Sequence, residues 1–103
     1  MAHTETRTYS SSPSDVVLAV RAAAEQLGWK VRSEDPSTWV IFLSTKVSLR
    51  SWGEHVTVTI RAVEGGSDVD ITVALRGQLV GWGAQKRSAL KLTDALDGIL
   101  ATP

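Results

Sequence analysis

The two histidines of this chain are its best candidates for acid–base chemistry near neutral pH. His3 lies in a polar N-terminal segment, and His55 follows Glu54 at the start of an alternating segment. A general base needs a positioned partner and a pocket. One hypothesis is therefore an active centre built from Glu54, His55 and Arg76. The simpler interpretation is a surface histidine beside a cation, so we predict that the protein is not an enzyme and has no catalytic residues.

Metal and cofactor sites have no signature in the sequence. There is no cysteine, the two histidines are far apart, and the acidic residues are scattered rather than grouped as in a calcium loop. The Gly65-Gly66 pair is followed by a strand pattern rather than a helix, so it is not a phosphate-binding loop. We therefore predict neither a bound metal nor a cofactor.

A candidate ligand site lies near the expected start of the last helix. Lys86 and Arg87 follow Gly81-Trp82-Gly83 there, and a helix start offers free N–H groups to an anion. Trp52 resembles Trp82, because each precedes a glycine in an irregular segment. These four side chains could bind a small apolar or anionic, lipid-like ligand. The alternative is that the tryptophans close the core and the cations are simply solvated.

The segment from Trp39 to Thr45 is apolar on both faces of the strand that it predicts. Trp39, Ile41 and Leu43 share one face, and Val40 and Phe42 share the other. A strand of this kind is either covered on both sides or part of an interface. Val40 and Phe42 are thus candidate contacts for a homodimer or a protein partner. The alternative is that the N-terminal segment covers them, with Tyr9 as the covering side chain.

Nucleic acid is not an expected partner. Eleven basic residues balance eleven acidic ones, so there is no net charge to attract a polyanion. The polar face of the sheet would carry several cations, but sheets that bind single strands also need stacking aromatic side chains. Only Phe42 could serve on that face.

The elements that must position these residues include one clear hairpin, between Val56 and Leu75. Apolar residues alternate with polar ones on both sides of Gly65-Gly66, which suits the tip of a tight primed turn. A slip by one residue would exchange the two faces of the sheet. With the two glycines at the tip, the predicted pairs are Val58 with Val73, Ile60 with Ile71, Thr59 with Thr72 and Arg61 with Asp70.

Two amphipathic helices flank the strands. The first begins at Ser12-Pro13-Ser14-Asp15, a typical N-cap followed by proline, and ends at Gly28. The second is expected from about Gly83 to Leu100. Its apolar stripe consists of Ala89, Leu92, Leu96, Ile99 and Leu100.

The order of elements predicts an α+β fold: a two-layer sandwich in which an antiparallel sheet of four to five strands carries two helices on one face, in the order (β)αββββα. Residues 1–103 would form one domain, with residues 1–10 as an edge strand or a flexible tail. The polar start of the chain is not a secretory signal, and no apolar run approaches the roughly 20 residues of a membrane span. We therefore expect a cytoplasmic protein without a transmembrane segment.

Two short motifs carry a resemblance to a known class of domain. The Ser51-Trp52-Gly53-Glu54 strand motif and the Gly81-Trp82-Gly83 helix entry resemble a small α+β domain that recurs in uncharacterised bacterial proteins. The resemblance covers residues 12–100 and implies a bacterial source but no activity. A more distant likeness is to helix-grip lipid-binding domains, although this chain is too short for us to expect their usual cavity.

The function that these observations favour is a non-enzymatic binding or protein-interaction module. The alternative is a small carrier or sensor of an apolar or anionic ligand.

Overall fold

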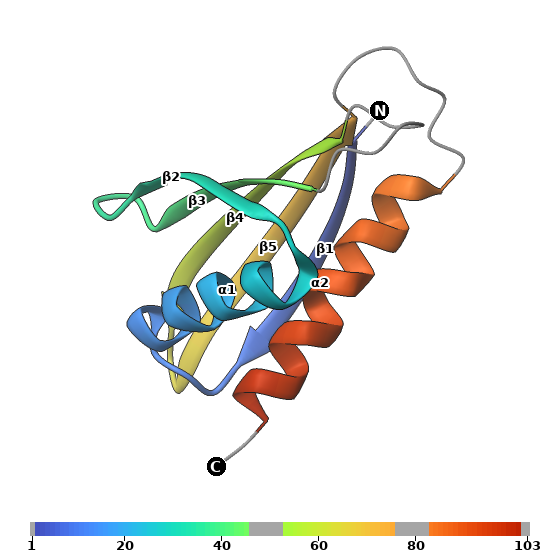
Figure 1. Cartoon of the computed structure of the whole chain (residues 1–103). Helices are drawn as coiled ribbons and strands as arrows, with labels where there is room; N and C mark the ends of the chain where they lie inside the picture. The colour runs from blue at the N-terminus through green and yellow to red at the C-terminus, as the bar shows by residue number, and fades with distance from the viewer. Residues whose placement is uncertain (1, 46–52, 76–82, 102–103) are drawn as a thin grey trace.

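The computed structural model describes residues 2–45, 53–75 and 83–101. A five-stranded antiparallel sheet carries both helices on one face (Figure 1). The elements are β1 (Ala2–Tyr9), α1 (Pro13–Leu27), β2 (Lys30–Asp35), β3 (Val40–Ser44), β4 (Glu54–Val63), β5 (Gly66–Leu75) and α2 (Ala84–Leu100). The strands lie side by side in the order β1-β5-β4-β3-β2. This confirms the predicted fold class.

The N-terminal segment forms a full edge strand. β1 pairs along its whole length with β5, and the hydroxyls of Thr6 and Thr8 donate to Asp70 and Asp68. The hydroxyl of Tyr9 donates to Asp97 of α2 over 2.7 Å, and burial together with that carboxylate raises the pKa of Tyr9. β1 and β3 are separated by two strands. The prediction that Tyr9 covers Val40 and Phe42 is therefore wrong.

The central hairpin keeps its predicted faces but has a different register. Val58 pairs with Ile71 and Ile60 pairs with Val69, which is a shift of two residues from the prediction. Since side chains alternate with a period of two, this shift changes partners and leaves each residue on its predicted face. Arg61 and Asp70 still form an ion pair, now on a diagonal, with 2.5 Å between Nη1 and Oδ2.

The register differs because the two glycines have different roles. The loop consists of Glu64 and Gly65, and of the pair only Gly65 has a positive φ, of 81°. Gly66 already belongs to β5, where an added Cβ would lie 1.9 Å from the carbonyl oxygen of Tyr9. Gly66 therefore allows the end of β1 to approach the hairpin closely, and it does not form the turn.

Both helices form as predicted and bury their apolar stripes against the sheet. Ser12 caps α1 by accepting the N–H of Asp15 over 3.2 Å, and Gly28 ends the helix with a φ of 73°. The core is one layer of aliphatic side chains between the helices and the sheet: Val16, Val20, Ala23, Ile41, Leu43, Val56, Val58, Ile60, Val69, Ile71, Val73, Ala89, Leu92 and Leu96. No helix in the described ranges is long and apolar enough to cross a membrane.

The β2–β3 side of the sheet departs most from prediction. Trp39 lies in the turn before β3 with a φ of 57°, rather than on a strand face. Such a backbone conformation is unusual for a bulky residue. Trp39 and Trp29 are half-buried and pack against the edge of the core, not within it.

Candidate functional site

Of the four predicted ligand-site residues, the structure describes two. Trp52 and Trp82 lie outside the described residues. Lys86 and Arg87 are exposed in the first turn of α2, which follows Gly83 with a φ of 82° and has no side-chain cap. The described residues therefore place the two cations at one helix end, and their role as ligands remains a prediction.

The proposed catalytic group does not assemble on β4. Glu54 is buried on the helix side of the sheet, whereas the neighbouring His55 is exposed on the other side. Consecutive residues of a strand point to opposite faces, so these two side chains cannot converge, and Arg76 lies outside the described residues. Within residues 2–45, 53–75 and 83–101, no three acidic or histidine side chains come together to hold a metal ion.

The predicted interface residues separate into two environments. Phe42 is 43% exposed on the outer face of the sheet, where Arg32, His55 and Thr57 border the same depression, which has a volume of about 320 Å³. Val40 is half-buried and lies at the wall of a pocket near the β2–β3 turn.

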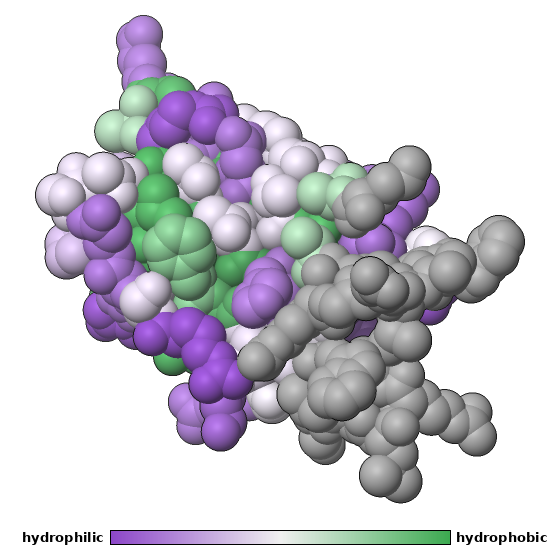
Figure 2. All heavy atoms as spheres, turned by 90° about the horizontal axis from the view of Figure 1, so that it is seen from above, coloured by the Kyte–Doolittle hydropathy of each residue, from purple (hydrophilic) through white to green (hydrophobic). Residues whose placement is uncertain are grey.

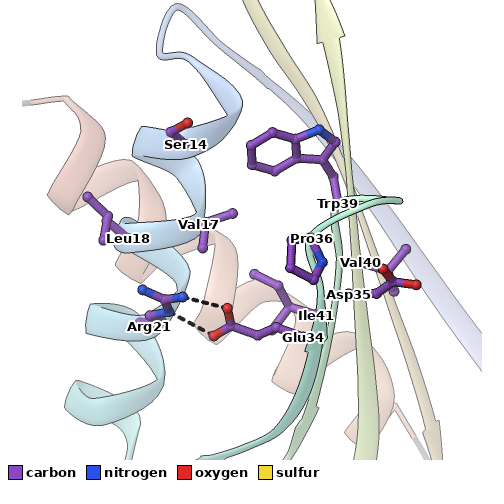
Figure 3. A pocket seen from close by; sticks show the side chains of 10 residues that line it. All are labelled: Ser14, Val17, Leu18, Arg21, Glu34, Asp35, Pro36, Trp39, Val40 and Ile41. Atoms are coloured by element: carbon purple, nitrogen blue, oxygen red, sulfur yellow. Dashed lines mark hydrogen bonds and ion pairs between the residues drawn. The ribbon is translucent and has the colours of Figure 1, made fainter.

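That pocket, here called the apolar pocket, lies between the first half of α1 and the β2–β3 turn (Figure 3). Its volume is about 320 Å³. Its walls are largely carbon and come from both layers of the molecule. The apolar lining residues are Val17, Leu18, Pro36, Trp39, Val40 and Ile41.

The two ends of the apolar pocket differ. Figure 3 shows the indole of Trp39 at one end, and the side chains of Arg21 and Glu34 bound to each other at the other. Arg21 donates from Nε and Nη2 to the two carboxylate oxygens over 2.7 and 2.6 Å, which joins α1 to β2. The hydrogen bonds from Arg21 lower the pKa of Glu34. The charges at this end thus neutralise each other.

A second pocket, here called the Glu54 pocket, lies where the end of α1, the start of β4 and the first half of α2 meet. Its volume is about 490 Å³. Its lining residues are Gln26, Leu27, Trp29, Thr45, Glu54, Ser88 and Lys91, so polar and apolar groups are mixed. The two pockets border opposite halves of α1.

Neither pocket was found from the sequence, although one signal was available. Glu54 has the same strand parity as Val56, Val58 and Ile60, which all face the helices. The alternation therefore places a carboxylate on the buried face of the sheet. The apolar pocket depends on the position of the β2–β3 turn relative to α1, which the residue pattern does not specify.

Comparison with known proteins supports the fold and goes no further. No protein-family model matches the chain, and no curated protein matches its sequence. Similar solved structures do exist. Protein MLL2253 from Mesorhizobium loti aligns with a TM-score of 0.74 at 13% identity, over 98% of this chain and 97% of its own.

Two further structures indicate what kind of fold this is. A START superfamily protein from Mycobacterium smegmatis aligns with a TM-score of 0.65 at 14% identity, over 97% of both chains. The Zhui aromatase/cyclase from Streptomyces sp. R1128 aligns with a TM-score of 0.54 at 10% identity, over 96% of this chain and 86% of its own. The resemblance to a small uncharacterised bacterial domain stays a prediction, because no family model matches the chain. The chain has a START-like α+β fold.

Proposed function

We propose that this protein is a small carrier or sensor that binds a compact, uncharged apolar molecule in the apolar pocket. The observation that carries this proposal is the carbon-lined pocket between α1 and the β2–β3 turn (Figure 3). Pockets that bind small molecules are mostly apolar, with a few polar groups that set orientation. The apolar pocket has this composition.

The size of the pocket limits the ligand. A volume of about 320 Å³ is near the lower end of the range for ligand pockets, about 300–1,000 Å³. One or two rings, or a short acyl chain, would fill it. Arg21 and Glu34 neutralise each other, and the third charged lining residue, Asp35, points away from α1 (Figure 3) and accepts hydrogen bonds from Ser37. This arrangement favours an uncharged molecule.

The conformation of Trp39 supports a functional role for this wall. A bulky residue with positive φ costs roughly 1–3 kcal/mol and persists only where its surroundings hold it. Such residues cluster at ligand-binding sites, and this one places an indole beside the pocket.

The test is to fill the pocket with a larger side chain and to measure how far the affinity for a simple apolar ligand falls. Toluene would be titrated into ¹⁵N-labelled protein, with the Trp39 indole N–H as the NMR reporter. We expect Val17→Trp to weaken binding tenfold or more by occupying the space. Val63→Trp is the matched control, because Val63 is exposed beside the β4–β5 turn and does not line the pocket. Equal toluene affinity in both variants would contradict the proposal.

A second candidate function is a protein-interaction module that uses the outer face of the sheet. Phe42 is a large apolar side chain exposed beside Arg32, His55 and Thr57. Figure 2 shows an apolar area bordered by hydrophilic residues in the half of the view where β2 and β3 lie. An exposed aromatic residue in a polar surround suits a homodimer contact.

A further inference from the structure

The β2–β3 side of the outer sheet face carries a cation that is not neutralised by an acidic side chain. Arg7, Arg21 and Arg61 each form an ion pair with a carboxylate. Arg32 instead donates from Nε to the hydroxyl of Ser44 over 2.8 Å, and it has no acidic partner in the part of the chain that the structure describes. A guanidinium held by a hydroxyl keeps its charge and further N–H donors for another partner.

A β-bulge brings Arg32 to this position. The pairing of β2 with β3 shifts at this residue, between the Val31–Leu43 pair and the Ser33–Phe42 pair. Bulges insert an extra residue into a strand, and they occur next to active sites, where they redirect a side chain. Here the extra residue is the arginine, which binds a side chain of the neighbouring strand.

The depression beside this guanidinium, here called the Phe42 depression, has a volume of about 320 Å³. Its lining residues are Arg32, Phe42, Leu43, His55, Val56 and Thr57, and no acidic residue is among them. In the register of β3 with β4, Phe42 pairs with Thr57, and Ser44 pairs with His55. These four residues form a two-by-two array, and Arg32 is hydrogen-bonded to one corner of it. An exposed phenyl ring and a cation therefore lie side by side.

The nearest acidic residues on the same side of the sheet are bound elsewhere. Asp35 accepts the hydroxyl of Ser37 in the β2–β3 turn over 2.6 Å. Asp68 and Asp70 of β5 form ion pairs with Arg61, and β4 separates β5 from β3. The described residues thus leave the charge at the Phe42 depression available to an anion.

We propose that the Phe42 depression binds a small aromatic carboxylate. The carboxylate accepts two N–H donors of the Arg32 guanidinium, whose planar shape suits this group, and the aromatic ring packs against the ring of Phe42. Lys30, the strand partner of Ser44, adds a second positive charge beside the site. This site is separate from the apolar pocket and does not depend on the function proposed for it.

Three probes separate the two parts of such a ligand: benzoate has both, benzyl alcohol lacks the charge, and acetate lacks the ring. Each is titrated at low salt into the full ¹⁵N-labelled chain, and the affinity is read from the backbone amides of His55 and Thr57. We expect benzoate to bind about fivefold or more tightly than either of the others, a modest factor because the site is open to solvent. Benzoate binding no tighter than the other two, or no saturable response of these amides, would overturn the proposal.

A matched pair of variants tests the role of the guanidinium. Arg32→Gln should lower the affinity for benzoate about fivefold and leave that for benzyl alcohol unchanged. Arg7→Gln makes the same charge change on β1, at the opposite edge of the sheet, and should have no effect. Equal losses in the two variants would show a general effect of net charge and would contradict the proposal.

A third variant tests the ring and separates this site from a homodimer contact. Phe42→Leu keeps an apolar side chain, so it should weaken benzoate about threefold and leave acetate unchanged. Native mass spectrometry of the parent chain gives the oligomeric state. A dimer that Phe42→Leu dissociates, together with amides that do not respond to benzoate, would assign this face to the homodimer and contradict the proposal.

Discussion

The apolar pocket and the Glu54 pocket lie in the same helix–sheet layer but suit different chemistry. Both border α1 and the β2–β3 side of the sheet, one beside the first half of α1 and the other at its end. In the apolar pocket Arg21 and Glu34 neutralise each other, whereas in the Glu54 pocket a buried carboxylate oxygen has no donor among the described residues. The backbone architecture therefore provides the space, and a few side chains decide what can occupy it.

The largest expected effect comes from removing a core side chain of β3. Leu43 is fully buried in the core, and truncating such a residue leaves a cavity. We expect Leu43→Ala to lower the free energy of unfolding by about 2–5 kcal/mol, measured by urea denaturation. Phe42→Ala, one residue away on the exposed face, should cost clearly less. Similar losses in the two variants would mean that the core does not extend into β3 as described.

The next largest effect is on toluene binding, and it distinguishes the two pockets because each is lined by a different tryptophan. Trp39→Asn should abolish toluene binding while changing the free energy of unfolding by only about 1 kcal/mol, because asparagine tolerates a positive φ and relieves strain. Trp29 has no positive φ, so Trp29→Asn gains no such relief. We expect it to be the less stable variant and to keep toluene binding. The comparison fails if Trp29→Asn is the variant that loses toluene.

A smaller effect on stability is expected on the outer face of the sheet. Phe42→Asp should keep the fold and lower the unfolding free energy by only about 1 kcal/mol, because the side chain is 43% exposed but aspartate has a low β propensity. If Phe42 forms a homodimer contact, the variant should be monomeric where the parent chain is dimeric. Native mass spectrometry measures the masses of the parent chain and of the variant. The same oligomeric state in both would rule out Phe42 as a homodimer contact.

The smallest effect concerns the ion pair that closes the apolar pocket. Arg21 lowers the pKa of Glu34, so the pair stabilises the fold above the ordinary glutamate value of about 4.3 and loses this contribution as the pH falls through the lowered value. The small stability difference between the parent chain and Arg21→Met should therefore be present at neutral pH and vanish in acid. Thermal unfolding at low salt measures it, and a difference that persists in acid would assign another role to Arg21.

The sequence predicted those parts of the fold for which a local residue pattern allows only one arrangement. Ser12 and Gly28 bound α1 as predicted, and the alternation in β4 and β5 assigned residues 56–63 and 69–74 to their correct faces. The register failed by two residues because Gly66 is needed for contact with Tyr9, a residue that is distant in sequence. A local residue pattern carries no information about such contacts between segments that are distant in sequence.

The candidate sites were less predictable for the same reason. The apolar pocket arises from the distance between α1 and a turn in which Trp39 takes an unusual conformation, and residue alternation had assigned Trp39 to a strand face. Glu54 could have been identified, since its parity places it among buried valines. Its significance depends on Ser88, which reaches it from the last helix.

The most direct test of the central proposal is to locate a bound apolar molecule by NMR. Toluene would be added to isotope-labelled protein, and intermolecular NOEs from the toluene methyl group to valine and isoleucine methyl groups would be recorded. The account predicts NOEs to Val17 and Ile41, which line the pocket, and a saturating shift of the Trp39 indole signal. NOEs confined to other parts of the molecule, or no saturable binding at millimolar toluene, would contradict it.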